Sequence, residues 1–154
     1  MRVMRIISPH ERFALLIVEG DAAARHRIEQ AAANTGRFWS IRAMADGRFA
    51  LEYLWSCLEQ ARRDVPDIII TNTHLPGLDG QQLTRELRRY DELRRSFVAV
   101  FSDTGDPLEQ DVAETAGCDF FLRRPDDPAE LSRELQAIAN RCGTQAFAPE
   151  RLLG

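Results

Sequence analysis

Short apolar runs alternate with longer amphipathic segments along most of the chain. The first run, from Phe13 to Val18, is apolar at every position, which is typical of a strand covered on both faces of a parallel sheet. Four further short runs, rich in β-branched or aromatic residues, follow at intervals long enough for a helix. We therefore predict strands over residues 13–18, 38–43, 67–71, 97–101 and 119–122.

The segments between these runs carry apolar residues at helical spacing, and most begin with an aspartate that suits a helix N-cap. Asp79 and Gln82 have the spacing of a capping box, and Asp106 is followed by a proline, which is favoured in the first turn of a helix. We predict helices that begin after Asp21, Asp46, Asp79, Asp106 and Asp127, the last of them ending near Cys142 and Gly143.

The apolar residues of these helices also predict which sides pack inward. Leu108, Val112 and Ala116 are expected to form the buried side of the fourth helix. Trp39 and Trp55 are interpreted as packing residues. The second helix is expected to face the sheet with Ala50, Leu54, Cys57, Leu58 and Ala61.

Five strands that alternate with five helices through short connections predict a doubly wound parallel α/β sheet with right-handed crossovers. In such folds the functional surface lies beyond the carboxyl ends of the strands. The residues that follow the predicted strands therefore matter most. They include Glu19, Gly20, Asp21, Asn72, His74, Ser102, Asp103 and Arg124.

Four segments in the same order and spacing resemble the response regulator receiver domain, the CheY-like domain of two-component phosphorelay signalling. They are residues 18–21, an acidic turn; 67–80, a phosphoacceptor strand and loop; 98–102, a strand that ends in a switch hydroxyl; and 116–125. The resemblance implies a flavodoxin-like fold with strand order 2-1-3-4-5. It also implies a stand-alone receiver over residues 13–142, with an N-terminal extension over 1–12 and a tail over 143–154.

The chain departs from the family where the phosphotransfer chemistry takes place. Asn72 stands in the position of the phosphoacceptor aspartate, and a neutral amide is a poor nucleophile. Gly20 replaces the second acid after the first strand, and Arg124 replaces a lysine. By the resemblance, Glu19, Asp21 and the backbone carbonyl of His74 remain as candidate oxygen ligands. We therefore expect no catalytic residue, no enzymatic activity, no cofactor and no Mg²⁺ binding.

The resemblance assigns roles to two further residues, and the substitutions suggest an interaction. Ser102 matches the switch hydroxyl, and Phe121 matches the switch aromatic residue, which we expect to be a buried, fixed ring. We predict that Arg124 pairs with Glu19 and donates a hydrogen bond to the amide oxygen of Asn72.

Composition narrows the function classes further. The chain has 154 residues and a formal charge of −4, and all 20 of its basic residues are arginines. This balance argues against nucleic acid or an anionic membrane as a partner. Since the chain contains no lysine, Arg124 alone is weak evidence for lost activity, whereas Gly20 and Asn72 are not explained in this way. We interpret Arg88, Arg89, Arg94 and Arg95 as a solvated face balanced by neighbouring acids.

These observations favour a phosphorylation-independent signalling protein that binds other proteins. No run is long enough to span a bilayer, so we expect a cytoplasmic protein with reduced cysteines. The expected partners are a histidine kinase, another regulator or a second copy, with a homodimer as one outcome. The face expected to bind them comprises the fourth helix, fifth strand and fifth helix, within residues 106–141. Two alternatives remain: a weak phosphoacceptor that uses Asp21 or Asp103, and a small-molecule sensor at the carboxyl edge of the sheet.

Overall fold

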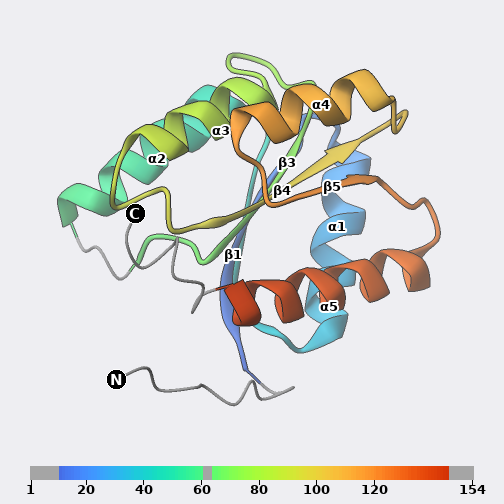
Figure 1. The fold of residues 1–154 in the computed structure, drawn as a ribbon. Coiled ribbons are helices and arrows are strands. Elements are labelled where there is room, and N and C mark those ends of the chain that lie inside the picture. Colours follow the sequence, from blue (N-terminus) through green and yellow to red (C-terminus); the bar gives the residue numbers. More distant parts are fainter. Residues whose placement is uncertain (1–10, 61–63, 146–154) are drawn as a thin grey trace.

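The computed structural model describes residues 11–60 and 64–145, which form one five-stranded parallel sheet (Figure 1). The strand order is β2-β1-β3-β4-β5, which confirms the predicted fold class and strand order. Each strand matches a predicted one, with ends that differ by at most one residue. The strands are β1 (Phe13–Val18), β2 (Phe38–Met44), β3 (Ile68–Asn72), β4 (Phe97–Ser102) and β5 (Phe120–Arg123).

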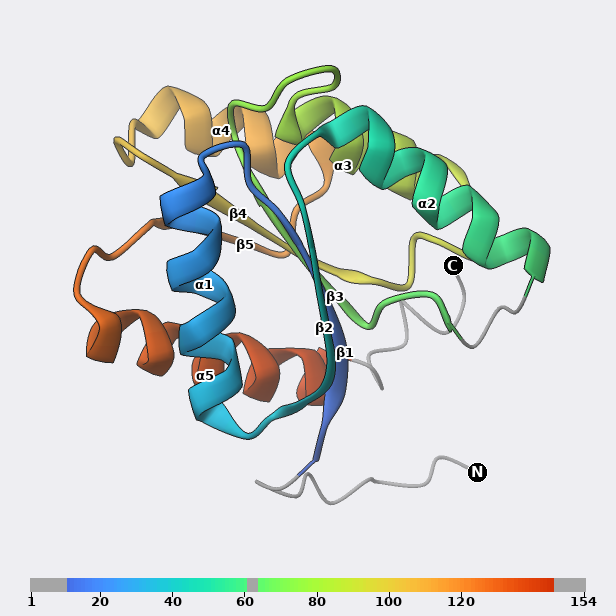
Figure 2. The same cartoon turned by 180° about the vertical axis from the view of Figure 1, so that it is seen from behind.

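Five helices cover the two faces of this sheet. One face carries α1 and α5, and the other carries α2, α3 and α4 (Figures 1 and 2). The connection from β1 to β2 runs in one direction along the sheet, and the connections from β2 to β5 run in the other. Because crossovers between parallel strands are right-handed, this reversal places α2, α3 and α4 on the opposite face from α1. The helices are α1 (Ala22–Thr35), α2 (Gly47–Gln60), α3 (Gly80–Arg89), α4 (Pro107–Ala116) and α5 (Pro128–Gln145).

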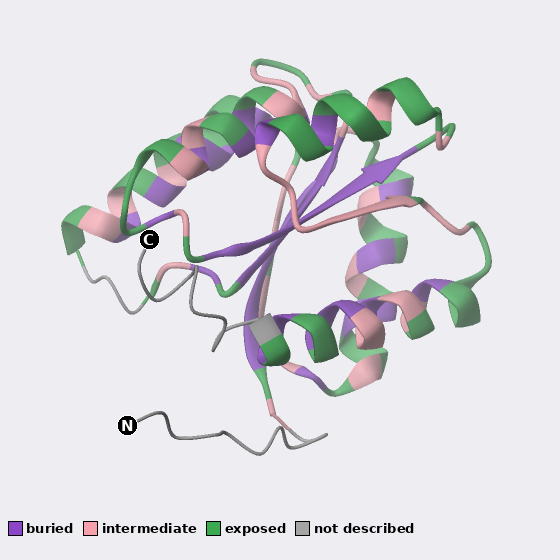
Figure 3. Cartoon of the chain, viewed as in Figure 1, coloured by how far each residue is buried: buried purple, intermediate pink, exposed green. Residues whose placement is uncertain are grey.

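The hydrophobic core consists of two layers, one on each side of the central strands. Every residue of β1, β3 and β4 is buried, as expected for strands that are apolar on both faces (Figure 3). Leu135 and Ile138 of α5 pack in one layer, whereas Leu54 of α2 and Leu83 of α3 pack in the other. The edge strands β2 and β5 are only partly buried.

The predicted helix starts are confirmed by the hydrogen bonds of their capping residues. Asp21 accepts from the backbone N–H of Ala24, and Asp79 and Gln82 form a complete capping box. Asp106 accepts from the backbone N–H of Leu108. These caps place the N-termini of α1, α3 and α4 at the carboxyl edge of the sheet, after the loops that follow β1, β3 and β4 respectively.

The packing of α4 differs from the prediction. Leu108 and Val112 are 72% and 39% exposed, and the buried residues of this helix are Ala113 and Ala116. The helix turns its small residues toward the sheet, together with Glu109, which bonds to the end of β4. Ala116 is buried as predicted, whereas Leu108 and Val112 are not, because the spacing of apolar residues gives no information about an inward-facing carboxylate.

Four other expectations also need correction or fall outside the described chain. Trp39 is 61% exposed, which does not fit a packing residue, whereas Trp55 packs edge-on against the Tyr90 ring with 6.4 Å between the centroids. Helix α5 extends to Gln145, two residues beyond the predicted end near Cys142 and Gly143. Ala61 and most of the predicted extension and tail lie outside the described residues.

The arginine cluster near α3 is also not simply a solvated face. Arg88 donates to the backbone carbonyls of Arg94, Ser96 and Gly117 and forms a 2.8 Å ion pair with Asp119. It therefore ties α3 to the turns that flank β4 and α4. Arg89, its neighbour, is exposed and pairs only along its own helix.

No helix within the described residues is both long enough and apolar enough to pass through a membrane.

Candidate functional site

The loops that follow β1, β3, β4 and β5 bring the predicted site residues together at the carboxyl edge of the sheet. Glu19, Asn72 and Ser102 are 3%, 4% and 0% exposed, so each of these polar groups needs a hydrogen-bonding partner. The parallel register places Val18 beside Thr71 and Asn72 beside Phe101, which aligns the ends of the central strands. The site is thus a direct consequence of the strand order.

The carboxylate of Glu19 is the centre of this site. Its Oε1 atom accepts hydrogen bonds from Asn72 Nδ2 at 2.8 Å and from Arg124 Nη1 at 2.8 Å. Its Oε2 atom accepts from the backbone N–H of Asp21 at 3.1 Å. Both oxygens are therefore engaged, and a buried cation balances the buried negative charge.

Arg124 is the cation, and it bridges two carboxylates. Its Nη1 atom lies 2.8 Å from Glu19 Oε1 and 2.9 Å from Asp103 Oδ1, and its side chain is only 14% exposed. The backbone N–H of Arg124 donates to the carbonyl of Ser102, which places the start of this side chain at the end of β4. The predicted pair with Glu19 is thus present. Asp103 is a second partner that the sequence did not indicate.

The predicted hydrogen bond between Arg124 and Asn72 was wrong. The amide oxygen of Asn72 accepts from the backbone N–H of His74 at 3.0 Å, while its amide nitrogen donates to Glu19 and, at 3.4 Å, to Asp103. The carboxylates of Glu19 and Asp103 accept hydrogen bonds, so they attract the amide nitrogen of Asn72. The amide oxygen therefore points toward the loop after β3. The asparagine is thereby held in one orientation.

A second network lies beside the first and centres on Glu109. Ser102 Oγ donates to Glu109 Oε2, and Thr104 Oγ1 donates to the same oxygen at 3.3 Å. Glu109 Oε1 lies 3.2 Å from His74 Nε2. The carboxylate lies between the histidine and the serine. In a catalytic triad the histidine lies between the serine and the carboxylate and takes the serine proton, so this arrangement is not a catalytic triad.

Three other predicted residues lie at or near this edge. Asp21 caps α1 and is exposed. A Cβ atom on Gly20 would lie 3.1 Å from Pro76 Cδ, so a larger residue there requires a small shift of the loop. Phe121 is half-buried and packs against the core layer under α4, which differs from the fully buried ring that we expected.

The residues present do not fit a divalent cation. Mg²⁺ requires several oxygen ligands in octahedral geometry, usually including free carboxylates. Here the two oxygens of Glu19 and one oxygen of Asp103 already accept hydrogen bonds, and the guanidinium of Arg124 lies against both residues. Within residues 11–60 and 64–145, no three His, Cys, Asp or Glu side chains are grouped in a way that holds a metal ion.

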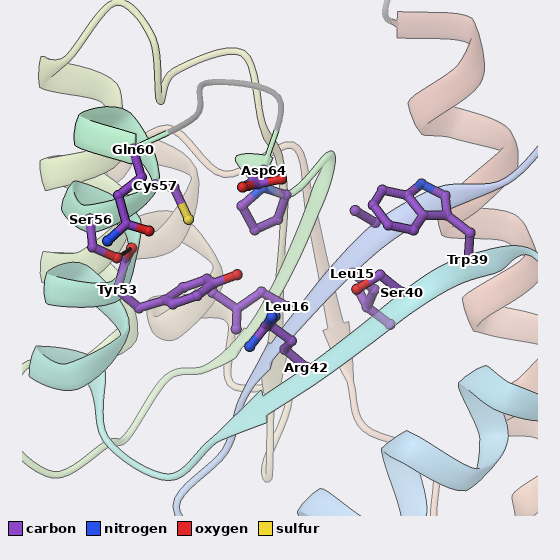
Figure 4. A pocket seen from close by; sticks show the side chains of 12 residues that line it. Leu15, Leu16, Trp39, Ser40, Arg42, Tyr53, Ser56, Cys57, Gln60 and Asp64 are labelled. Carbon is purple, nitrogen blue, oxygen red and sulfur yellow. Dashed lines mark hydrogen bonds between the residues drawn. The ribbon is translucent and has the colours of Figure 1, made fainter.

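A cavity of about 230 Å³ lies elsewhere, between β1, β2 and the second half of α2 (Figure 4). Leu15 and Leu16 line it together with Trp39, Arg42 and Tyr53. Arg42 stacks on the Tyr53 ring at 5.4 Å. Because this cavity also contacts Ala14 and the residues before β3, it lies toward the amino ends of the strands, away from the site.

Comparison with known proteins agrees with this arrangement. The family model of the response regulator receiver domain matches residues 15–136. The chain is 32% identical over 129 residues to the transcriptional regulatory protein CseB of Streptomyces coelicolor, covering 84% of this chain and 50% of that protein. It is 28% identical to the response regulator Rre1 of Synechocystis, with coverage of 85% and 53%. The chain thus spans about half the length of these curated relatives.

Solved structures share the fold. The phosphorylated cyanobacterial phytochrome response regulator RcpA superposes with a TM-score of 0.72 at 21% identity, covering 90% of this chain and 96% of that one. The receiver domain of a sensor histidine kinase from Pseudomonas aeruginosa has a TM-score of 0.67 at 27% identity, with coverage of 84% and 98%. That structure holds a magnesium ion in its active site cleft.

Fold, strand order, site position and sequence similarity all lead to one family. The family model matches residues 15–136, which is most of the chain. The predicted site residues lie at the carboxyl edge of the sheet, where doubly wound parallel sheets have their functional sites. This chain belongs to the response regulator receiver domain family, the signalling domains of two-component systems, which interact with proteins such as kinases and regulators.

Proposed function

We propose that this receiver has lost phosphotransfer and acts as a phosphorylation-independent protein-binding module. The observation that carries the proposal is the ion cluster at the carboxyl edge of the sheet. Arg124 pairs with Glu19 and Asp103 there, and Asn72 occupies the position that the family resemblance assigns to the phosphoacceptor aspartate. An internal cation thus takes the place of a metal ion.

The chemistry of Asn72 supports the loss of phosphotransfer. A carboxylate attacks phosphorus through an anionic oxygen, whereas an amide oxygen is neutral and weakly nucleophilic. In this chain that oxygen also accepts a hydrogen bond from the backbone N–H of His74, and the amide nitrogen is bound to Glu19. The side chain is therefore fixed in a role that is purely structural.

The electrostatics of the cluster support the loss of Mg²⁺ binding. A divalent cation near Glu19 would be repelled by the guanidinium of Arg124, whose position is fixed by two ion pairs. In a site shielded from water this repulsion is stronger than at an exposed surface. Binding a metal ion would therefore require Arg124 to leave, which would break its ion pairs with Glu19 and Asp103.

The surface proposed to bind a protein partner comprises α4, β5 and α5. Leu108 and Val112 project outward from α4, and exposed apolar side chains one helical turn apart are suited to a protein contact. The proposed partners are a histidine kinase, another regulator or a second copy of this chain. Each could be recognised without a change in the ion cluster.

Incubation with acetyl phosphate and Mg²⁺, followed by intact-protein mass spectrometry, tests the proposal. We expect no acid-labile mass gain corresponding to one phosphoryl group. Asp21→Asn and Asp103→Asn variants address the alternative of a substitute acceptor. A phosphoryl adduct on the wild-type chain that disappears in either variant would establish a weak phosphoacceptor and overturn the proposal.

A further inference from the structure

We propose that Glu109 is a built-in latch that fastens the first turn of α4 to the end of β4 and so determines which side of α4 faces outward. The inference rests on the proposed function, because in a receiver that has lost phosphotransfer Ser102 has no phosphoryl group to bind, and Glu109 accepts its hydrogen bond instead.

The hydrogen bonds of Ser102 show how the latch is built. This hydroxyl is fully buried, so its proton needs an acceptor, and Glu109 Oε2 provides one. The same hydroxyl oxygen accepts from the backbone N–H groups of Thr104 at 3.2 Å and Gly105 at 2.9 Å. Ser102 therefore joins the β4 end, the following turn and the carboxylate in one network.

The other oxygen of Glu109 extends the network to a second loop. Its Oε1 atom lies 3.2 Å from the Nε2 atom of His74, which lies in the loop after β3, two positions beyond Asn72. Thr104 Oγ1 also donates to Glu109 and accepts from the backbone N–H of Asp106, the N-cap of α4. One carboxylate thus connects the β3–α3 loop, the β4–α4 turn and the helix itself.

The latch explains the unexpected orientation of α4. Glu109 shares the inward side of the helix with Ala113 and Ala116, which lie about one and two turns further along and are buried. Leu108 and Val112 consequently face outward. The two alanines bury little apolar area, so they give only a weak preference for this orientation of α4. The carboxylate of Glu109 bonds to three side chains and therefore contributes much of the preference.

Amide hydrogen exchange of the full chain tests the latch. In Glu109→Ala, exchange of the Thr104 and Gly105 amides and of the α4 amides is expected to accelerate about tenfold or more, because their shared acceptor network is lost. Glu109→Gln keeps an acceptor oxygen and should retain most of the protection. Glu114→Ala is the matched control, since Glu114 lies on α4 and accepts only a 2.9 Å bond from Gln110 among the bonds described for its side chain.

A second variant makes the test decisive even if Glu109→Ala folds poorly. Ser102→Ala removes the other half of the Ser102–Glu109 bond, so at the α4 amides the effects of the two single variants should combine less than additively in the double variant, because both remove this interaction. The proposal is overturned if Glu109→Ala exchanges like Glu114→Ala, or if the two single effects add. Failure of the proposed function would appear separately, as a phosphoryl adduct.

Discussion

At the scale of single residues, the site depends on how one buried charge is balanced. Glu19 is almost fully buried and would be strongly destabilising without a cation. The guanidinium of Arg124 supplies this positive charge, and its Nη1 atom contacts the carboxylates of both Glu19 and Asp103. The pair therefore stabilises the fold where the family resemblance predicts a chemical site.

Removal of this arginine should therefore be costly. Arg124→Ala is expected to lower the free energy of unfolding by about 3 kcal/mol, because it leaves Glu19 buried without a counterion. Arg124→Lys should lose much less, since it keeps the charge. The control is Arg123→Ala at the exposed neighbouring position. Urea denaturation measures all three, and equal stability of Arg124→Ala and Arg123→Ala would contradict the account.

A second prediction at this scale concerns the reactivity of a thiol. Burial, followed by the nearby charges of Asp119 and Glu114, raises the pKa of Cys118 to about 11 from its usual value of 9.0. At pH 8 the thiolate fraction is therefore about 100-fold lower than in the unfolded chain. Alkylation of Cys118, followed by peptide mass spectrometry, should be slower in native than in urea-unfolded protein by about this factor. Native alkylation at the unfolded rate would show that the thiol is not shielded.

At the scale of elements, Arg88 does more for the fold than the charge pattern of its helix indicates. It donates to three backbone carbonyls and to Asp119, which also accepts from the backbone N–H of Val98. These bonds join α3 to the turn before β4 and to the turn before β5. In the sequence Arg88 is one arginine among acidic residues. A charge pattern does not reveal which backbone carbonyls accept hydrogen bonds from such a side chain, so this role was not predictable.

Neighbouring arginines on α3 allow a matched test of this role. Arg88→Ala should lower the free energy of unfolding by about 3 kcal/mol, since several buried carbonyls lose a charged donor. Arg89→Ala should change it by less than about 0.5 kcal/mol, because Arg89 makes one exposed pair within its helix. Thermal or urea unfolding of both variants provides the comparison. Similar losses of unfolding free energy in the Arg88→Ala and Arg89→Ala variants would show that Arg88 contributes no more than an ordinary surface charge.

The elements themselves were largely predictable, for reasons that also explain the errors. Continuous apolar runs define buried strands to within one residue, and Asp caps define helix starts. The inward side of α4 was not predictable in this way. Leu108 and Val112 have the spacing of a buried stripe, but the interaction that orients the helix is polar and joins residues on two different elements.

At the scale of the whole molecule, the fold brings the site residues to the carboxyl edge of the sheet. The strand order brings Glu19, Asn72, Ser102 and Arg124 together, as the sequence predicted, because parallel strands end on one side. The direction of the Asn72 amide was not predictable, since an amide donates and accepts equally well and only its neighbours decide. The sequence indicated Asp103 only as a substitute phosphoacceptor, whereas in the structure it also forms an ion pair with Arg124.

The central claim is that Arg124 occupies the place of a metal ion. A Mg²⁺ titration followed by the amide resonances of Glu19, Asn72 and Arg124 tests it most directly, with the Gly20→Asp, Asn72→Asp, Arg124→Lys triple variant as the reference. That variant restores two acids and removes the planar cation, at the expense of a small shift of the loop near Pro76. We predict saturable shifts at millimolar Mg²⁺ in the triple variant and none in the wild-type chain. Saturable binding by the wild-type chain, or no binding by either, would contradict the account.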